Sequence, residues 1–105
     1  MENKLKIIEL TCDSLAGLDT EIRFNIASER AEGVNLVRFD IKSDSDSRLR
    51  LAIKVLRRMK SEGAVQVFAS RDSFASEDTE ASYINNKYGK ILENLPDFEF
   101  VIVKI

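Results

Sequence analysis

Residues 21–43 of the chain are EIRFNIASERAEGVNLVRFDIKS. Each half of this stretch alternates apolar and polar residues, with Ile22, Phe24 and Ile26 in the first half and Val37, Phe39 and Ile41 in the second. Alternation with a period of two is typical of a strand that buries one face. Residues 30–33 between the halves end in glycine and suit a turn. The stretch therefore predicts a β-hairpin with strands at residues 21–29 and 34–43.

Pairing position 29 with position 34 sets the register of this hairpin. Phe24 then faces Phe39, and Arg23 lies opposite Asp40. Apolar side chains meet apolar ones and opposite charges meet, which is how cross-strand pairs stabilise a sheet. A slip of one residue would destroy both matches, so we expect this antiparallel pairing.

Helical and strand patterns continue on both sides of the hairpin. They predict a strand at residues 4–12, a helix from the capping cluster 44–47 to Gly63, a strand at 64–69, a helix from Ser76 to Leu95 and a strand at 98–105. The expected fold is an α+β (α/β) two-layer sandwich with a mixed five-stranded sheet, in the order strand, strand, strand, helix, strand, helix, strand. The first three strands should form an antiparallel meander, and the last three, joined by helical crossovers, should run parallel. We expect both helices on one face of the sheet and the other face at least partly open.

Composition limits the chemistry that the chain can perform. Its 105 residues suffice for one hydrophobic core, so we expect a single domain over residues 1–105. The net charge of −2 gives no overall field that attracts nucleic acid or an anionic membrane. One cysteine and no histidine exclude an internal disulfide, a cysteine-based zinc site and histidine acid–base chemistry within the chain. We expect a cytoplasmic protein without cofactor or metal.

The polar face of the predicted hairpin is the first candidate binding surface. It carries Arg23, Arg38, Asp40 and Lys42. The run Asp40-Ile41-Lys42 near a strand end resembles the acidic-plus-lysine core of restriction-type nucleases. That resemblance implies magnesium held by carboxylates and a lysine that stabilises the attacked phosphate or positions water. A ladder of surface ion pairs accounts for the same residues without catalysis.

A second candidate lies where the predicted parallel strands end. Ser70 and Arg71 precede the helix that is expected from Ser76, and free amides at a helix N-terminus can bind an anion. Acidic residues follow closely at positions 72, 77, 78 and 80, and they repel an anion. A solvated connection with a helix cap is the favoured interpretation.

The third candidate is the predicted helix that ends at Gly63. Its basic residues are Arg48, Arg50, Lys54, Arg57, Arg58 and Lys60, with no acid among them. Arg50, Lys54 and Arg57 share one face at helical spacing. Such a face suits RNA, DNA or an acidic protein, although charged helix exteriors are often only solvated.

These features favour a non-enzymatic interaction module that acts through the polar sheet face or the basic helix. We expect a protein partner or a second copy of the chain. Nucleic acid as a partner is compatible with the basic helix but disfavoured by the acidic balance of charge, and no membrane partner is expected. The alternative is a magnesium-dependent phosphodiester-cleaving enzyme centred on Asp40 and Lys42.

Overall fold

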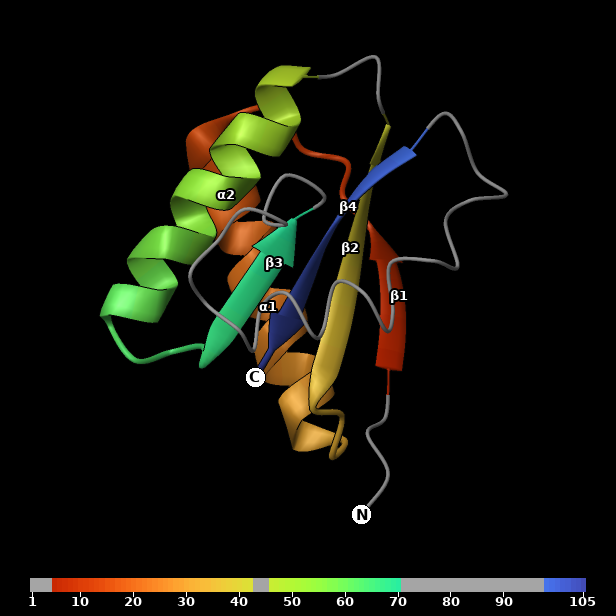
Figure 1. Cartoon of the computed structure of the whole chain (residues 1–105), viewed down its shortest axis with the longest axis vertical. Coiled ribbons are helices and arrows are strands. Elements are labelled where there is room, and N and C mark those ends of the chain that lie inside the picture. Colours follow the sequence, from red (N-terminus) through yellow and green to blue (C-terminus); the bar gives the residue numbers. More distant parts are fainter. Residues whose placement is uncertain (1–4, 43–45, 71–97) are drawn as a thin grey trace.

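The computed structural model of this chain describes residues 5–42, 46–70 and 98–105. These residues form a small α+β domain with a mixed four-stranded sheet and two helices (Figure 1). In chain order the elements are β1 (Leu5–Glu9), α1 (Leu15–Ala31), β2 (Leu36–Lys42), α2 (Asp46–Ser61), β3 (Val67–Ser70) and β4 (Phe98–Lys104). The strand order across the sheet is β1-β2-β4-β3.

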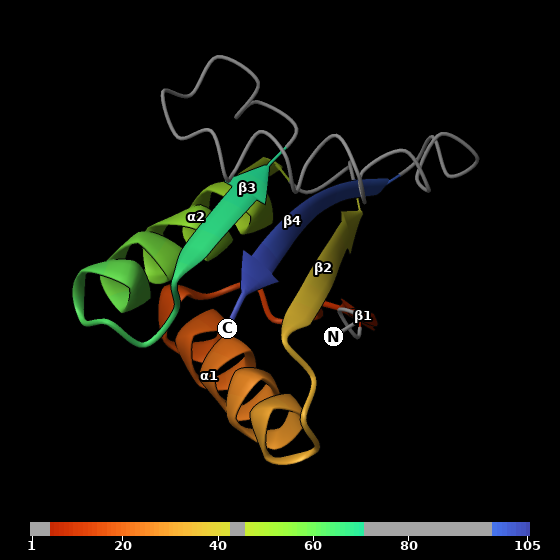
Figure 2. The same cartoon turned by 60° about the horizontal axis from the view of Figure 1, so that its bottom comes forward.

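Three of the four strands run in the same direction. β1 pairs with β2 in parallel, and β4 is antiparallel to both of its neighbours, β2 and β3. The connections through α1 and α2 both move the same way across the sheet, and connections of one hand then place both helices on one face. Figures 1 and 2 show α1 and α2 together on one side of the sheet.

The core lies between the sheet and the two helices. Residues of β2 and β4 that share the helix-facing side pack with the inner faces of α1 and α2, and the buried set includes Val37, Phe39, Ile41, Val101, Val103, Leu18, Ile22, Ile26, Ala52, Val55, Leu56 and Met59. The opposite face of the two central strands is buried as well, at Leu36, Arg38, Asp40, Phe100 and Ile102. The expectation that this second face is open is therefore wrong for the centre of the sheet.

The predicted hairpin is also wrong, because residues 21–29 belong to α1 and not to a strand. Leu18, Ile22 and Ile26 recur at intervals of four and are each at most 1% exposed, which is the helical period. Phe24, which completes the alternation, is 70% exposed on the outer side of α1. The side chain of Ser14 caps the helix by accepting a hydrogen bond from the Gly17 amide at 3.0 Å. The Arg23–Asp40 and Phe24–Phe39 pairings consequently do not exist.

The last strand has the opposite direction to the one expected. β4 lies between β2 and β3 and is antiparallel to both, with Phe39 opposite Val101 and Phe68 opposite Val103. Its apolar run is buried on both faces, as a central strand requires, and a continuous apolar run does not indicate strand direction. Within the described residues the sheet has four strands, so the predicted fifth strand and the antiparallel meander are not confirmed.

Five other predictions of secondary structure, four strands and one helix, are confirmed. The strands predicted at residues 4–12, 34–43, 64–69 and 98–105 correspond to β1, β2, β3 and β4, and the basic helix corresponds to α2. The residues of β2 also alternate as expected, with Val37, Phe39 and Ile41 on the side of the helices. The helix predicted from Ser76 to Leu95 lies outside the described residues.

Candidate functional site: the basic face of α2 and the adjoining groove

The six basic residues of α2 do not play the same part in the structure. Arg48 donates from Nε to the carbonyl of Cys12 at 3.0 Å and to Oδ1 of Asp13 at 3.1 Å, which ties α2 to the connection between β1 and α1. Lys60 also has an interaction partner. The other four are exposed and make no ion pair with any described residue: Arg50, Lys54, Arg57 and Arg58. We call these four the basic face.

The helical repeat places the basic face away from the core. α2 buries Ala52, Val55, Leu56 and Met59, and at about 3.6 residues per turn Arg50, Lys54 and Arg57 lie on the opposite side. Arg58 lies on the flank next to α1, where it borders a groove. Residues 47–61 of α2 contain no acid, and the one carboxylate of this helix belongs to its first residue, Asp46.

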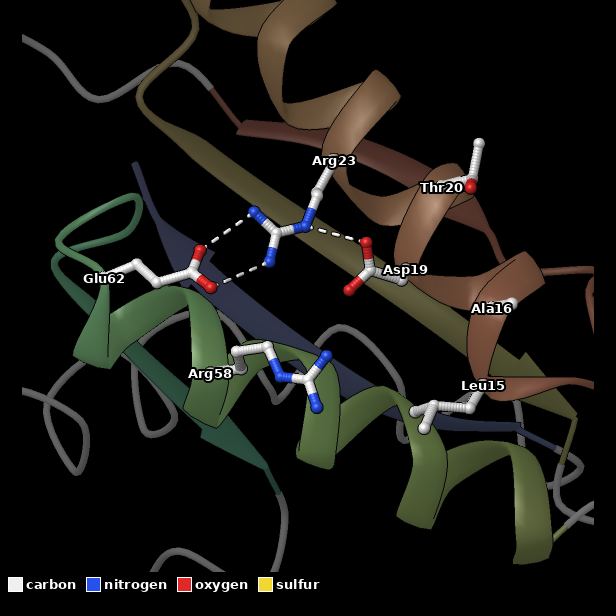
Figure 3. Close-up of a pocket in the computed structure, with 7 residues that line it drawn as sticks. All are labelled: Leu15, Ala16, Asp19, Thr20, Arg23, Arg58 and Glu62. Atoms are coloured by element: carbon white, nitrogen blue, oxygen red, sulfur yellow. Dashed lines mark hydrogen bonds and ion pairs between the residues drawn. The ribbon is translucent and has the colours of Figure 1, made fainter.

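An open groove with a volume of about 620 Å³ runs between α1 and α2. Its walls are formed by Leu15, Ala16, Asp19, Thr20 and Arg23 of α1, together with Arg58 of α2 and Glu62 directly after α2 (Figure 3). The groove therefore brings apolar, hydroxyl and charged groups from both helices to one place.

Arg23 spans this groove and is fully compensated. Its Nε donates to Oδ1 of Asp19 at 2.8 Å, and its Nη1 and Nη2 donate to Glu62 at 3.0 and 3.4 Å. The bonds to Glu62 and then those to Asp19 raise the pKa of the Arg23 guanidinium above its ordinary value. Arg58 lines the same groove and has no bonded carboxylate among the described residues, so it is the uncompensated cation there.

Only three of the four residues predicted for the polar sheet face lie on the same face of the sheet. Arg38, Asp40 and Lys42 do share the face of β2 that points away from the helices, but Arg23 lies on α1. Arg38 is 2% exposed and donates from Nε and Nη2 to the two carboxylate oxygens of Asp40, at 2.8 and 3.1 Å. Only Lys42, at the end of the strand, is exposed. The pair is thus an internal contact of the sheet.

A metal site at Asp40 finds no support in this arrangement. Both oxygens of Asp40 already accept hydrogen bonds from Arg38. Across residues 5–42, 46–70 and 98–105, no group of three or more carboxylate or cysteine side chains could hold a metal ion. Ser70 is the last residue of β3, and Arg71 lies outside the described residues, so the anion site predicted there stays a prediction.

Sequence reasoning missed the groove because the alternation at residues 21–29 predicts a strand, whereas these residues belong to α1. The spacing from Asp19 to Arg23 is i to i+4, which places two such side chains together only on a helix. Together with the interval of four between Leu18, Ile22 and Ile26, it is the signal that identifies α1. The contact to Glu62, 39 residues away, has no local signal.

Comparison of the chain with protein-family models, with curated proteins and with solved structures finds no match. In the described part of the chain, neither helix has the length and apolar character needed to cross a membrane.

Proposed function

We propose that this chain is a non-enzymatic interaction module that binds an acidic segment of a partner protein through the basic face of α2. The observation that carries the proposal is that the basic side chains of α2 differ in their contacts. Arg48 is held internally, whereas Arg50, Lys54, Arg57 and Arg58 are exposed and form no ion pair with a described residue. These four cations, exposed on the outer side of one helix, form a positive surface on a chain whose net charge is −2.

An acidic protein segment suits this surface better than a nucleic acid. An exposed ion pair contributes only about 0.2–1 kcal/mol, so recognition needs several pairs and a complementary arrangement. The basic face is one helix long, and the carboxylates of Asp19 and Glu62 lie at its border. A continuous phosphate backbone would meet these carboxylates, while an acidic helix can match individual cations.

The basic face is also a better candidate than the polar sheet face. Arg38 and Asp40 are committed to each other and buried, so they offer little to a partner. Lys42 alone remains exposed on that side of β2. We therefore place the interaction on α2.

The proposal is tested with a short, fluorescein-labelled peptide in which glutamates and leucines are interspersed with alanines. Fluorescence anisotropy gives its Kd for the full chain at low and at high salt. We expect saturable binding that weakens with salt, because exposed charge pairs are screened. The double variant Lys54→Gln/Arg57→Gln should weaken binding by about tenfold, or 1.4 kcal/mol.

The matched control is Lys6→Gln/Lys42→Gln, which removes the same charge from exposed positions on β1 and β2. It should change the Kd by less than about twofold, or 0.4 kcal/mol. Equal losses in the two double variants would show attraction to overall charge and would overturn the proposal. Tighter binding of a single-stranded oligonucleotide of equal charge, lost in the α2 variant, would assign the face to nucleic acid instead.

Magnesium-dependent phosphodiester cleavage at Asp40 and Lys42 stays a prediction that no observation here favours. Paramagnetic manganese titrated into ¹⁵N-labelled protein provides its test. Selective broadening of the amides around Asp40 would support a metal at that carboxylate. Unchanged signals there would exclude the site.

A further inference from the structure

We infer that the groove between α1 and α2 receives a carboxylate side chain of the acidic partner, with Arg58 as the residue that binds it. This inference rests on the proposed function and assigns a specific pocket within it. The groove adjoins the basic face, because Arg58 belongs to both. A partner helix that contacts Arg50, Lys54 and Arg57 therefore reaches the groove without a second site of contact.

The charges within the groove favour one added carboxylate. Asp19 and Glu62 already bond to Arg23 through distances of 2.8 and 3.0 Å. Arg58 has no such partner among the described residues, and Figure 3 shows its guanidinium lying over the groove between the two helices. An arginine binds a carboxylate through two parallel hydrogen bonds, which gives orientation as well as attraction.

The shape and lining of the groove suit a glutamate or aspartate side chain. The open groove of about 620 Å³ has room for an acidic side chain together with part of the backbone that carries it. Leu15 and Ala16 supply apolar contact at the end toward which the Arg58 guanidinium points (Figure 3). The methylene groups of an acidic side chain can pack there while its carboxylate meets Arg58.

The groove selects against a polyphosphate. Asp19 and Glu62 lie in its walls with side chains that are 28% and 45% exposed, so successive phosphates would approach two carboxylates. A single carboxylate that pairs with Arg58 carries one charge and meets less of this repulsion than successive phosphates do. The specificity of the site thus comes from Arg58, which has no carboxylate partner among the described residues, beside Arg23, which has two.

A second peptide tests binding to the groove separately from binding to the rest of the basic face. This probe is an acetylated, amidated peptide with one glutamate between leucines, and its twin carries glutamine at that position. Titration into ¹⁵N,¹³C-labelled protein should shift the signals of Leu15, Ala16 and the Arg58 side chain with millimolar affinity, whereas the twin should shift none of them. Arg58→Gln should weaken binding of the glutamate peptide at least about tenfold.

Lys6→Gln is the matched control, since it removes the same charge from an exposed position on β1, outside both the basic face and the groove. It should change the affinity for the single-glutamate peptide by less than about twofold. Equal effects of Arg58→Gln and Lys6→Gln, or shifts that spare Leu15 and Ala16, would overturn the groove inference. The glutamate-rich peptide would still bind through Lys54 and Arg57 in that case, so the proposed function would stand. Shifts of Leu15 and Ala16 produced by an oligonucleotide but not by the peptide would also overturn it.

Discussion

The guanidinium of Arg38 holds the carboxylate of Asp40 through two hydrogen bonds, Nε to Oδ1 at 2.8 Å and Nη2 to Oδ2 at 3.1 Å. The two residues lie on the same face of β2, and their side chains are 2% and 10% exposed. The third nitrogen of Arg38, Nη1, is buried and has no hydrogen-bond partner within the described part of the chain. Asp40 is therefore the group that compensates a charge inside the fold.

Removing Asp40 should destabilise the protein strongly. Asp40→Ala leaves the Arg38 cation buried and uncompensated, which typically costs about 3–5 kcal/mol. Urea unfolding followed by circular dichroism measures the change in the free energy of unfolding. The double variant Arg38→Met/Asp40→Leu is the control, because replacing a whole buried ion pair by apolar residues is often close to neutral. A loss below about 1 kcal/mol for Asp40→Ala would instead indicate a solvated pair and contradict its burial.

Truncation to alanine should destabilise the protein strongly at Ile22 and hardly at all at Phe24. Ile22 is 0% exposed and Phe24 is 70% exposed on α1. Ile22→Ala should lower the free energy of unfolding by about 2–5 kcal/mol, since it opens a cavity in the core. Phe24→Ala should stay within about 0.5 kcal/mol of the original chain, as is usual for exposed positions. A large loss at Phe24 would restore the hairpin interpretation, in which both residues face the core.

The link between Arg23 and Glu62 should contribute a small, salt-dependent stabilisation. Arg23→Gln removes hydrogen bonds between α1 and the end of α2, but the partners are about a third to a half exposed and therefore screened. We expect a slightly lower urea midpoint at low salt and no difference at high salt. A loss that persists at high salt would show that the contact acts through packing and not through charge.

The contribution of Arg23 to the free energy of unfolding depends on pH in a direction that follows from its raised pKa. Its hydrogen bonds raise the folded-state pKa, so the contribution is fully present below the unfolded pKa of arginine and is lost only as the pH rises through the folded value. The stability difference between Arg23→Gln and the original chain should therefore stay constant from neutral pH to moderately alkaline pH. A difference that disappears over this range would contradict the assignment.

Gly33 and Gly63 should be sensitive to alanine for conformational reasons alone. Their φ angles are +81° and +77°, and a Cβ built at either position meets no atom within 4 Å. The left-handed backbone costs an alanine roughly 1–2 kcal/mol, so both variants should lose about this much in thermal or urea unfolding. Unchanged stability in both would show that the turns after α1 and α2 relax.

Alternation alone could not distinguish α1 from a strand. Ile22, Phe24 and Ile26 satisfy a period of two, while Leu18, Ile22 and Ile26 satisfy the helical period. The two patterns share two residues, and they differ in what they require of Phe24. Only packing of the helix against the sheet shows that Phe24 is the exposed member.

One part of the candidate site, the basic face, can be predicted from the sequence, and the other part, the groove, cannot. The charges of Arg50, Lys54 and Arg57 and their common side of a helix follow directly from spacing, and the structure confirms that helix. The groove does not follow from spacing, because Arg23 and Glu62 are 39 residues apart and meet only when α1 packs beside α2.

The amino-acid pattern was sufficient for the elements whose periodicity has one interpretation: β1, β2, α2, β3 and β4, together with the polar and apolar sides of β2. Tertiary structure decided which of two periodicities residues 15–31 follow, and it alone decided the antiparallel insertion of β4 between β2 and β3 and the burial of Arg38 and Asp40. Periodicity is a property of neighbours along the chain. Strand direction, the covering of a sheet face and the pairing of distant charges depend on contacts between segments that the chain brings together only when it folds.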